Sequence, residues 1–222
     1  MNNKIVAIIP ARGGSKRIKN KNIKLFNSKP LIFWTIDAAL KSKKIDDVYV
    51  SSENKKILKI SKKFGADIIK RPIKLSNNII MPDIAIRDAY LQINKNYKYV
   101  VSLQPTSPLR TADEIDASIN KIIKTKADCL LSCFKAHPFI WKKNKKFFIS
   151  DNYNYKKRPR SQDVKQYQEN GSIYITKPDI LIKKRNRLGK KISIFEMSFW
   201  NSIDIDNIED FKIAELVMKK NR

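Results

Sequence analysis

Two of the five glycines in this chain, Gly13 and Gly14, are adjacent and follow an apolar run that ends at Pro10. Glycine allows backbone N–H groups to approach a ligand closely, and consecutive amides in such a loop can bind an anion. The cations around this loop are Arg12, Lys16, Arg17, Lys19 and Lys21. A triphosphate fits this chemistry, although the spacing matches neither a Walker A loop nor a dinucleotide-binding fingerprint. The alternative is a tight turn with a solvated basic face.

A pair of carboxylates lies near the other end of the chain, in the segment of sequence SIDID at residues 202–206. Alternation along an extended backbone puts Asp204 and Asp206 on one face and the isoleucines on the other. Two carboxylates at this spacing can hold Mg²⁺, which keeps several waters and binds substrate phosphates at the same time. The alternative is that the two acids cap the helix that follows.

Two further segments carry polar side chains next to strands. Residues 103–110 (LQPTSPLR) are stiffened by two prolines, and the side chains that could bind a polyhydroxylated ligand are Gln104, Thr106, Ser107 and Arg110. Residues 169–172 (ENGS) predict a turn that leads into a strand. The alternatives are a loop shaped only by its proline and serine residues and an ordinary β-turn.

Alternating strands and helices must position these segments. Apolar runs predict strands at residues 4–10, 47–51, 67–70, 99–103, 128–134, 171–176 and 191–196. Helical patterns occur at residues 30–43, 54–64, 82–93, 112–125 and 208–219, with Asn54 and Thr111 as N-caps. This order predicts an α/β fold with a mainly parallel sheet, in which ligands bind at the carboxyl ends of the strands. Both the glycine loop and residues 103–110 follow a strand, so we expect them at that edge.

The pattern of strands and helices breaks at about residues 135–165, a basic and aromatic stretch that contains the only histidine, His137. We interpret this stretch as an insertion, either a hairpin arm or a lid. The chain has no low-complexity linker, so we predict a single domain over residues 1–222. His137 precedes a proline inside the insertion, and we do not expect it to act as a general base.

The composition excludes several classes of protein. The 222 residues are 42% hydrophobic, which is enough for a packed core. No apolar run approaches the roughly 18–20 residues that span a bilayer, so no membrane segment is expected. Two cysteines are too few for a secreted disulfide scaffold, which favours a reducing cytoplasm. The net charge of +26 comes mainly from lysine, which attracts anionic substrates without the bidentate recognition that arginine provides.

These residues together resemble the acylneuraminate cytidylyltransferase family, the CMP-sialic acid synthetases. The similar motifs occur in the family's order along nearly the whole chain, at residues 8–16, 21–23, 71–72, 103–110, 170–175 and 202–206. The resemblance implies a nucleotide-diphospho-sugar-transferase-like fold. It also implies transfer of CMP from CTP to the anomeric hydroxyl of a nonulosonic acid for surface glycan biosynthesis, with Mg²⁺ and release of pyrophosphate. Family members are generally homodimers in which an arm reaches the partner, a role that suits the insertion at 135–165.

The resemblance further implies roles for individual residues. Those that would bind CTP are Arg12, Gly13, Gly14, Ser15, Lys21, Asn22 and Arg71. Those that would bind the sugar are Gln104, Arg160 and Asn170. The metal ligands would be Asp204 and Asp206, and the residues central to catalysis would be Lys21, Arg12 and Asp206.

The chain departs from many relatives in two places that affect substrate recognition. Residues 76–82 (SNNIIMP) replace an aspartate and small hydroxyl residues near the cytosine, and Gln168-Glu169 stand where many relatives carry an arginine. The sugar could therefore be N-acetylneuraminate, a legionaminate-like acid or another nonulosonate. Three alternatives to this function are a cytidylyltransferase for 3-deoxy-manno-octulosonate, a catalytically silent nucleotide-binding subunit, and a basic nucleic-acid-binding protein, which would bind with a steep dependence on salt.

Overall fold

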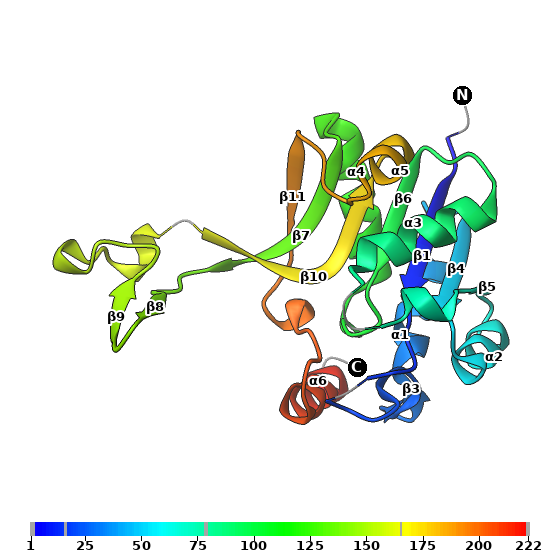
Figure 1. Ribbon diagram of the computed structural model, residues 1–222, viewed down its shortest axis with the longest axis horizontal. Helices are drawn as coiled ribbons and strands as arrows, with labels where there is room; N and C mark the ends of the chain where they lie inside the picture. Colours follow the sequence, from blue (N-terminus) through cyan, green and yellow to red (C-terminus); the bar gives the residue numbers. More distant parts are fainter. Residues whose placement is uncertain (1–2, 16, 78–79, 165, 221–222) are drawn as a thin grey trace.

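A central β-sheet organises the computed structural model, which describes residues 3–15, 17–77, 80–164 and 166–220 (Figure 1). Its strands are β1 (Ile5–Pro10), β4 (Asp47–Ser52), β5 (Asp67–Lys70), β6 (Tyr99–Leu103), β7 (Cys129–Ala136), β10 (Gln166–Thr176) and β11 (Ile192–Glu196). Within the described residues, these seven strands lie in the order β11-β7-β10-β6-β1-β4-β5. β10 runs antiparallel to β6 and β7, and the other neighbours run parallel. The predicted α/β fold with a mainly parallel sheet is confirmed.

Helices cover both faces of this sheet (Figure 1). They are α1 (Leu31–Lys41), α2 (Lys55–Lys63), α3 (Pro82–Ile93), α4 (Ala112–Thr125), α5 (Pro178–Lys184) and α6 (Ile208–Lys220). Ala7 and Ile9 of β1 lie in one core cluster with α1, α2 and α4, whereas Val6 and Ile8 lie in another with α3 and α5. Alternate side chains of β1 thus enter opposite cores, which explains why the strand is apolar throughout. None of these described helices is long and apolar enough to cross a membrane.

Side-chain caps fix where two of the helices begin. The side chain of Asn54 accepts hydrogen bonds from the amides of Lys56 and Ile57 at the start of α2. Thr111 and Glu114 form a reciprocal capping box at the start of α4. Each cap satisfies amides that have no partner inside the helix. Both predicted N-caps are confirmed.

Several short elements were not predicted from the sequence. α5 is one, and a small hairpin of β2 (Leu25–Phe26) and β3 (Lys29–Pro30) is another. Single 3₁₀ turns occur at η1 (Lys21–Ile23), η2 (Ile73–Leu75), η3 (Tyr155–Lys157), η4 (Ser161–Asp163) and η5 (Trp200–Ser202). These elements are too short to leave a periodic pattern in the sequence.

The prediction of a turn at residues 169–172 is wrong, because these residues lie inside β10. The pairing of β10 with β7 shifts register between Glu169 and Tyr174, and Gly171 has a φ of +71°. An irregularity inside a strand needs the same residue types as a turn, including a glycine where φ is positive. Residues 169–172 therefore mark an irregularity inside a strand and do not reverse the direction of the chain.

The end of β7 and the stretch that follows it, up to β10, project from the body of the molecule as an arm (Figure 1). We use this name for residues 135–165, of which Lys165 lies outside the described residues. The arm contains an antiparallel hairpin of β8 (Trp141–Asn144) and β9 (Phe147–Ser150). Large aromatic side chains of this hairpin are exposed, among them Trp141, Phe147 and Phe148. At the base of the arm, Nδ1 of His137 lies 2.8 Å from the carbonyl oxygen of Val164.

Candidate active site

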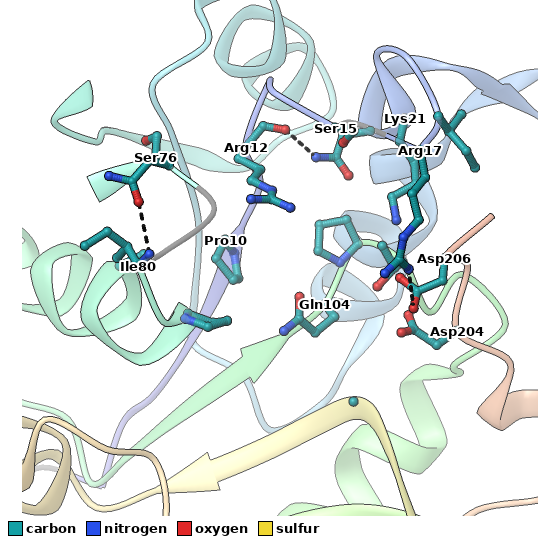
Figure 2. Close-up of a pocket in the computed structure, with 18 of the residues that line it drawn as sticks. Pro10, Arg12, Ser15, Arg17, Lys21, Ser76, Ile80, Gln104, Asp204 and Asp206 are labelled. Atoms are coloured by element: carbon teal, nitrogen blue, oxygen red, sulfur yellow. Dashed lines mark hydrogen bonds and ion pairs between the residues drawn. The ribbon is translucent and has the colours of Figure 1, made fainter. Parts of the chain in front are cut away.

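A cavity of about 510 Å³ opens at the carboxyl ends of β1 and β6 (Figure 2). Its lining comes from segments that are far apart in the sequence: Pro10, Arg12, Ser15, Arg17, Ile18, Lys21, Asn22, Arg71, Leu75, Ser76, Asn77, Ile80, Pro82, Ala85, Gln104, Pro105, Thr106, Gly171, Asp204 and Asp206. Open α/β sheets bind ligands at this edge. The structure thus brings together the glycine loop, residues 103–110 and the two acids, as the sequence predicts.

The glycine loop is held from behind by the segment that follows β4. The amide of Gly13 donates to Oε1 of Glu53 at 2.6 Å. A Cβ atom at position 13 would lie only 2.4 Å from Nδ2 of Asn54, so this position requires glycine, whereas a Cβ at Gly14 would meet nothing within 4 Å. The amide of Ser15 donates to the carbonyl of Gly13. These two amides therefore have acceptors within the protein, and Lys16, the next residue of the loop, lies outside the described residues.

Lys21 links the glycine loop to the acidic segment. Its Nζ donates to the carbonyl oxygen of Ile205 at 2.5 Å, although the two residues are 184 positions apart. Burial lowers the pKa of Lys21, and the charges of Asp204 and Asp206 oppose that effect. Next to it, the buried Asn22 donates from Nδ2 to the carbonyl of Arg12 at 2.9 Å and so fixes the backbone of the loop. The basic loop and the distant acids converge on one side of the cavity (Figure 2).

The two acids lie on one face of their segment, as their spacing predicts. Between them, Ile205 is buried in a cluster with α1 and α6, and its amide donates to the carbonyl of Thr106 at 2.9 Å. Asp206 is exposed and pairs with Arg17, whose Nη1 lies 2.8 Å from Oδ2. Asp204 lines the cavity and is exposed to solvent on that side, while the surrounding protein partly desolvates its carboxyl group. This desolvation and the nearby charge of Asp206 raise the pKa of Asp204, while a hydrogen bond from Thr106 opposes the rise.

The donor set at this position fits a magnesium ion that is shared with a phosphate. Among the described residues, no group of three or more His, Cys, Asp or Glu side chains could enclose a metal. Mg²⁺ is commonly held by one or two carboxylates together with substrate phosphates and water. Desolvation and the charge of Asp206 both raise the pKa of Asp204, and a bound cation would act in the opposite direction by favouring its charged form. Asp206 could serve as the second ligand once it separates from Arg17.

Arg71 lies on the other flank of the cavity. Its side chain is only 5% exposed, and its Nη2 lies 3.1 Å from Oε2 of Glu53. Within the described part of the chain, the buried Nε of Arg71 has no hydrogen-bond acceptor. Burial alone would raise the pKa of Glu53, but the amide of Gly13 and the charge of Arg71 are among the contacts that outweigh burial and lower it. Glu53 was not predicted from the sequence; its place directly after β4, at the same edge of the sheet, is the signal that could have identified it.

The segment after Arg71 closes the cavity opposite Lys21. Figure 2 shows Ser76 and Ile80 across the cavity from Asp204 and Asp206. The amide of Ile80 donates to Oδ1 of Asn77 at 3.0 Å. The part of the cavity lining that comes from this segment has backbone and apolar groups and few acidic side chains. Residues 78 and 79 of the sequence departure SNNIIMP lie outside the described residues.

Among the polar residues of the 103–110 loop, Gln104 and Thr106 line the cavity, but Ser107 and Arg110 do not. Arg110 is 3% exposed and donates to the carbonyl and hydroxyl oxygens of Ser172 and to the hydroxyl of Thr35. Burial lowers the pKa of Arg110 to about 9, which still leaves it charged at neutral pH. The expectation that Ser107 and Arg110 bind a polyhydroxylated ligand is therefore wrong, because both are buried and Arg110 fastens the loop to β10.

The two other residues predicted to bind the sugar lie away from this lining. Asn170 is 6% exposed; its Oδ1 accepts from the hydroxyl of Ser132 and its Nδ2 donates to the hydroxyl of Ser202. Arg160 lies in the arm, with a side chain that is 74% exposed and an ion pair with Asp163 at 2.9 Å. The structure of one chain thus assembles the predicted triphosphate and metal residues, but it does not bring Arg160 to them.

Comparison with known sequences shows the family to which the chain belongs. A profile of the cytidylyltransferase family matches residues 6–220. The N-acylneuraminate cytidylyltransferase of Escherichia coli O18:K1:H7 is 33% identical, over 100% of this chain and 54% of its own length. The pseudaminic acid cytidylyltransferase of Campylobacter jejuni is 32% identical, over 98% of this chain and 97% of its own. The chain therefore spans about half the length of the E. coli protein and nearly all of the Campylobacter protein.

Solved structures with the same fold include a synthetase and a synthase that are named for cytidine-containing compounds. The CMP:2-keto-3-deoxy-manno-octonic acid synthetase complexed with CTP has a TM-score of 0.77 at 16% identity, over 99% of this chain and 100% of its own. The 4-diphosphocytidyl-2C-methyl-D-erythritol synthase from Anaerococcus prevotii has a TM-score of 0.72 at 14% identity, over 98% and 99%. At these identities the likeness concerns the fold, and it confirms the predicted nucleotide-diphospho-sugar-transferase-like architecture.

Proposed function

The chain belongs to the cytidylyltransferase family, and on this premise we propose that it transfers CMP from CTP to the anomeric hydroxyl of a nonulosonic acid. The hydroxyl oxygen attacks the α-phosphorus of CTP and its proton passes to water, while the bond from that phosphorus to the bridging oxygen breaks and pyrophosphate leaves. The observation that carries the proposal is the contact between Lys21 and the carbonyl of Ile205, which sets a cation and two acids at one cavity. A cytoplasmic enzyme of surface glycan biosynthesis would have access to CTP. Both cysteines are free thiols, which fits the reducing conditions of the cytoplasm.

The cationic side of the cavity would neutralise the triphosphate. Transfer at phosphorus depends mainly on positioning and on offsetting charge at the oxygens of the leaving group. Lys21 and Arg12 would bind the β- and γ-phosphates, with Ser15 and the glycine loop next to them. Asn22 would contact the ribose, and Arg71 would contact the nucleotide from the opposite flank. All of these residues except the two glycines line the cavity.

Asp204 and Asp206 would hold the Mg²⁺ that accompanies CTP. A bound Mg²⁺ offsets charge on phosphate oxygens and polarises the phosphorus that is attacked. Other residues of the chain keep the two acids in position, because Ile205 anchors their segment in the core and Thr106 holds its backbone. Arg17 pairs with Asp206 and also lines the cavity, where its guanidinium would help to offset the charge of the phosphates.

The sugar would bind near Gln104, beyond the α-phosphate. Relatives at almost equal identity are named for N-acylneuraminate and for pseudaminic acid, so similarity supports the class of nonulosonic acids and does not select one. Gln168-Glu169, at the position where many relatives carry an arginine, favours a sugar other than N-acetylneuraminate itself. Asn170 would act beside this site by holding the irregular part of β10 in place.

We also propose that the enzyme is a homodimer in which the arm reaches the partner subunit. The support is the exposure of large apolar side chains on a projecting hairpin, including Phe147 at 77%. Large exposed apolar patches on a protein commonly mark an interaction surface. Arg160 lies on this arm and does not approach the proposed sugar site of its own chain. In a dimer, it would reach the sugar site of the partner subunit.

Product analysis tests the proposal directly. The chain is incubated with CTP, Mg²⁺ and one acid at a time from a panel of N-acetylneuraminate, legionaminate, pseudaminate and 3-deoxy-manno-octulosonate. We expect pyrophosphate release and a CMP-sugar mass with a nine-carbon acid, and neither in the Asp206→Asn variant. A CMP adduct of the eight-carbon acid alone would support the alternative sugar. CTP binding without any product would indicate a silent subunit, and tight, salt-sensitive binding to nucleic acid without CTP binding would overturn the proposal.

A further inference from the structure

Glu53 joins three segments that follow three neighbouring strands of the sheet. Gly13 follows β1, Glu53 follows β4 and Arg71 follows β5, and these strands are adjacent in the order β1-β4-β5. One carboxylate oxygen of Glu53 accepts from the amide of Gly13 at 2.6 Å, and the other lies 3.1 Å from Nη2 of Arg71. A single carboxylate thus ties both flanks of the cavity to its central strand.

The pair of Glu53 and Arg71 is largely removed from solvent. The side chains are 16% and 5% exposed, respectively. In such surroundings each charge depends on the other, because the loss of one partner leaves an uncompensated buried charge. The pKa of Glu53 lies below its ordinary value, so its carboxylate is charged at neutral pH.

A carboxylate beside a site for a polyanion requires an explanation. Two are possible: Glu53 could occupy the place of a phosphate and leave when CTP arrives, or it could remain and hold the groups that bind CTP. Arg71 lines the cavity, whereas Glu53 is not among the described residues that do. Glu53 therefore contacts Arg71 from behind the cavity wall, which favours the second explanation.

The neighbouring residue Asn54 also helps to hold the glycine loop in place. It caps α2 through Oδ1, and its side chain leaves no room for a Cβ atom at Gly13. The glycine loop is thus held by a hydrogen bond to Glu53 and by packing against Asn54, both at the start of a fixed helix. Preorganisation of this kind improves affinity because less ordering is required when the ligand binds.

We propose that Glu53 is a positioning residue that sets the affinity for CTP by orienting Arg71 and fixing the glycine loop. The inference rests on the proposed function for the identity of the nucleotide. Glu53 does not contact the reacting atoms, so it acts on the binding of CTP much more than on the chemical step. Glutamine at position 53 keeps an oxygen that can accept from the Gly13 amide, so the effect of Glu53→Gln passes mainly through Arg71, and a variant that lacks Arg71 should lose most of it.

The test compares Glu53→Gln and Glu53→Asp with the wild type and with a matched control. The control is Asp37→Asn, which removes a carboxylate from the Lys41–Asp37 ion pair on α1. CTP affinity is measured by calorimetry with Mg²⁺ and no sugar, and KM for CTP and kcat are measured by pyrophosphate release. Thermal unfolding shows which variants are folded, and Glu53→Asp keeps the test valid if Glu53→Gln does not fold.

We expect Glu53→Gln to weaken CTP binding and raise KM by about tenfold or more, since a hydrogen bond to a charged group contributes about 1.5–3 kcal/mol. kcat should stay within about threefold, Glu53→Asp should recover part of the affinity, and Asp37→Asn should match the wild type. In an Arg71→Ala background, Glu53→Gln should change the affinity by no more than about twofold.

Three results would overturn the inference. Tighter CTP binding by Glu53→Gln would mean that the carboxylate competes with phosphate. If Glu53→Gln left the affinity for CTP unchanged, Glu53 would have no role in CTP binding. If the effects of Glu53→Gln and Arg71→Ala on this affinity were fully additive, the two residues would act independently. Failure of the proposed function has a different signature, because the wild type itself would then bind no CTP or release no pyrophosphate.

Discussion

The two sides of the cavity differ in how completely one chain builds them. On the side proposed for the triphosphate, Lys21 contacts the carbonyl of Ile205, Ile205 contacts Thr106, and Glu53 contacts both Gly13 and Arg71. On the side proposed for the sugar, Gln104 lines the cavity, but Arg160 lies on an arm that projects from the body (Figure 1). We infer from this difference that the nucleotide site is preorganised within the chain and that the sugar site is completed by a second copy. Variants on each side should therefore fail in different ways.

The largest effect is expected from the acid that would hold the metal. Asp206→Asn should lower Mg²⁺-dependent turnover by at least ~10³-fold, since it removes a ligand whose metal contributes several kcal/mol to the transition state. The measurement is pyrophosphate release during a Mg²⁺ titration. Glu209→Gln, an exposed acid in the first turn of α6, is the control and should behave as the wild type. A Mg²⁺ titration of Asp206→Asn that superimposes on the wild-type curve would remove Asp206 from the site.

A smaller loss is expected for the cation that faces the same metal position. Lys21→Ala should reduce kcat by about 10²-fold, the scale of losing one donor to transition-state charge. The assay is steady-state turnover at saturating CTP. Lys19→Ala, which removes an exposed lysine of the same loop, should leave kcat within about twofold. Near-normal turnover of Lys21→Ala would contradict its role and would weaken the contrast between the two sides of the cavity.

On the other side, a variant of the arm should separate nucleotide binding from sugar transfer. The double variant Phe147→Ser and Phe148→Ser removes two exposed rings from the hairpin. We expect the mass in solution to fall to that of a monomer and kcat/KM for the sugar to fall by about tenfold, because a few buried aromatic side chains dominate the affinity of an interface. Calorimetry should show CTP affinity within about twofold of the wild type.

The control for the arm is Leu91→Ser, which changes an exposed apolar residue on α3. It should keep both the mass and the activity of the wild type. Two results would contradict the proposal that one chain builds the nucleotide site and that two chains complete the sugar site. One is a wild type that is monomeric in solution. The other is an arm variant that loses CTP affinity as much as sugar transfer.

The sequence was sufficient to predict the parts that depend on local patterns. The apolar run of β1, the caps Asn54 and Thr111, and the alternation around Ile205 each reflect a short-range rule. Their meeting at one edge also followed, because the carboxyl ends of parallel strands lie together. The predicted residues Lys21 and Asp206 therefore came together around one cavity without any knowledge of the strand order.

What the sequence did not reveal depends on which strands are neighbours. Glu53 contacts Arg71 only because β4 lies beside β5, with Ser52 paired with Lys70. Arg110 was expected to face a ligand, but the antiparallel insertion of β10 beside β6 brings Ser172 to it and buries it. Neither pairing leaves a periodic signal in the chain.

The smallest expected effect is a change in thermal stability. It comes from repulsion between Asp204 and Asp206 on the side of the cavity proposed for the nucleotide. Burial and the charge of Asp206 raise the pKa of Asp204, so the folded chain binds a proton there more readily than the unfolded chain does. The contribution of this group to stability therefore falls as the pH rises from the ordinary value of an aspartate through the raised pKa. At pH 7 without Mg²⁺, Asp204→Asn should raise Tm by about 2 °C or less, because the group opens onto solvent.

Differential scanning calorimetry with and without Mg²⁺ and CTP checks this expectation. The ligands should raise the Tm of the wild type by more than that of Asp204→Asn, since binding to the folded state alone stabilises it. At a pH below the ordinary pKa of an aspartate, the Tm difference between the two proteins should disappear, because both side chains are then neutral. The same substitution in the arm, Asp163→Asn, removes an acid that is paired with Arg160 on an exposed surface, so it should not raise Tm at pH 7. A lower Tm for Asp204→Asn at pH 7 would mean that Lys21 and Thr106 already offset the charge of Asp204, and the nucleotide side would then hold no unbalanced charge for a metal to neutralise.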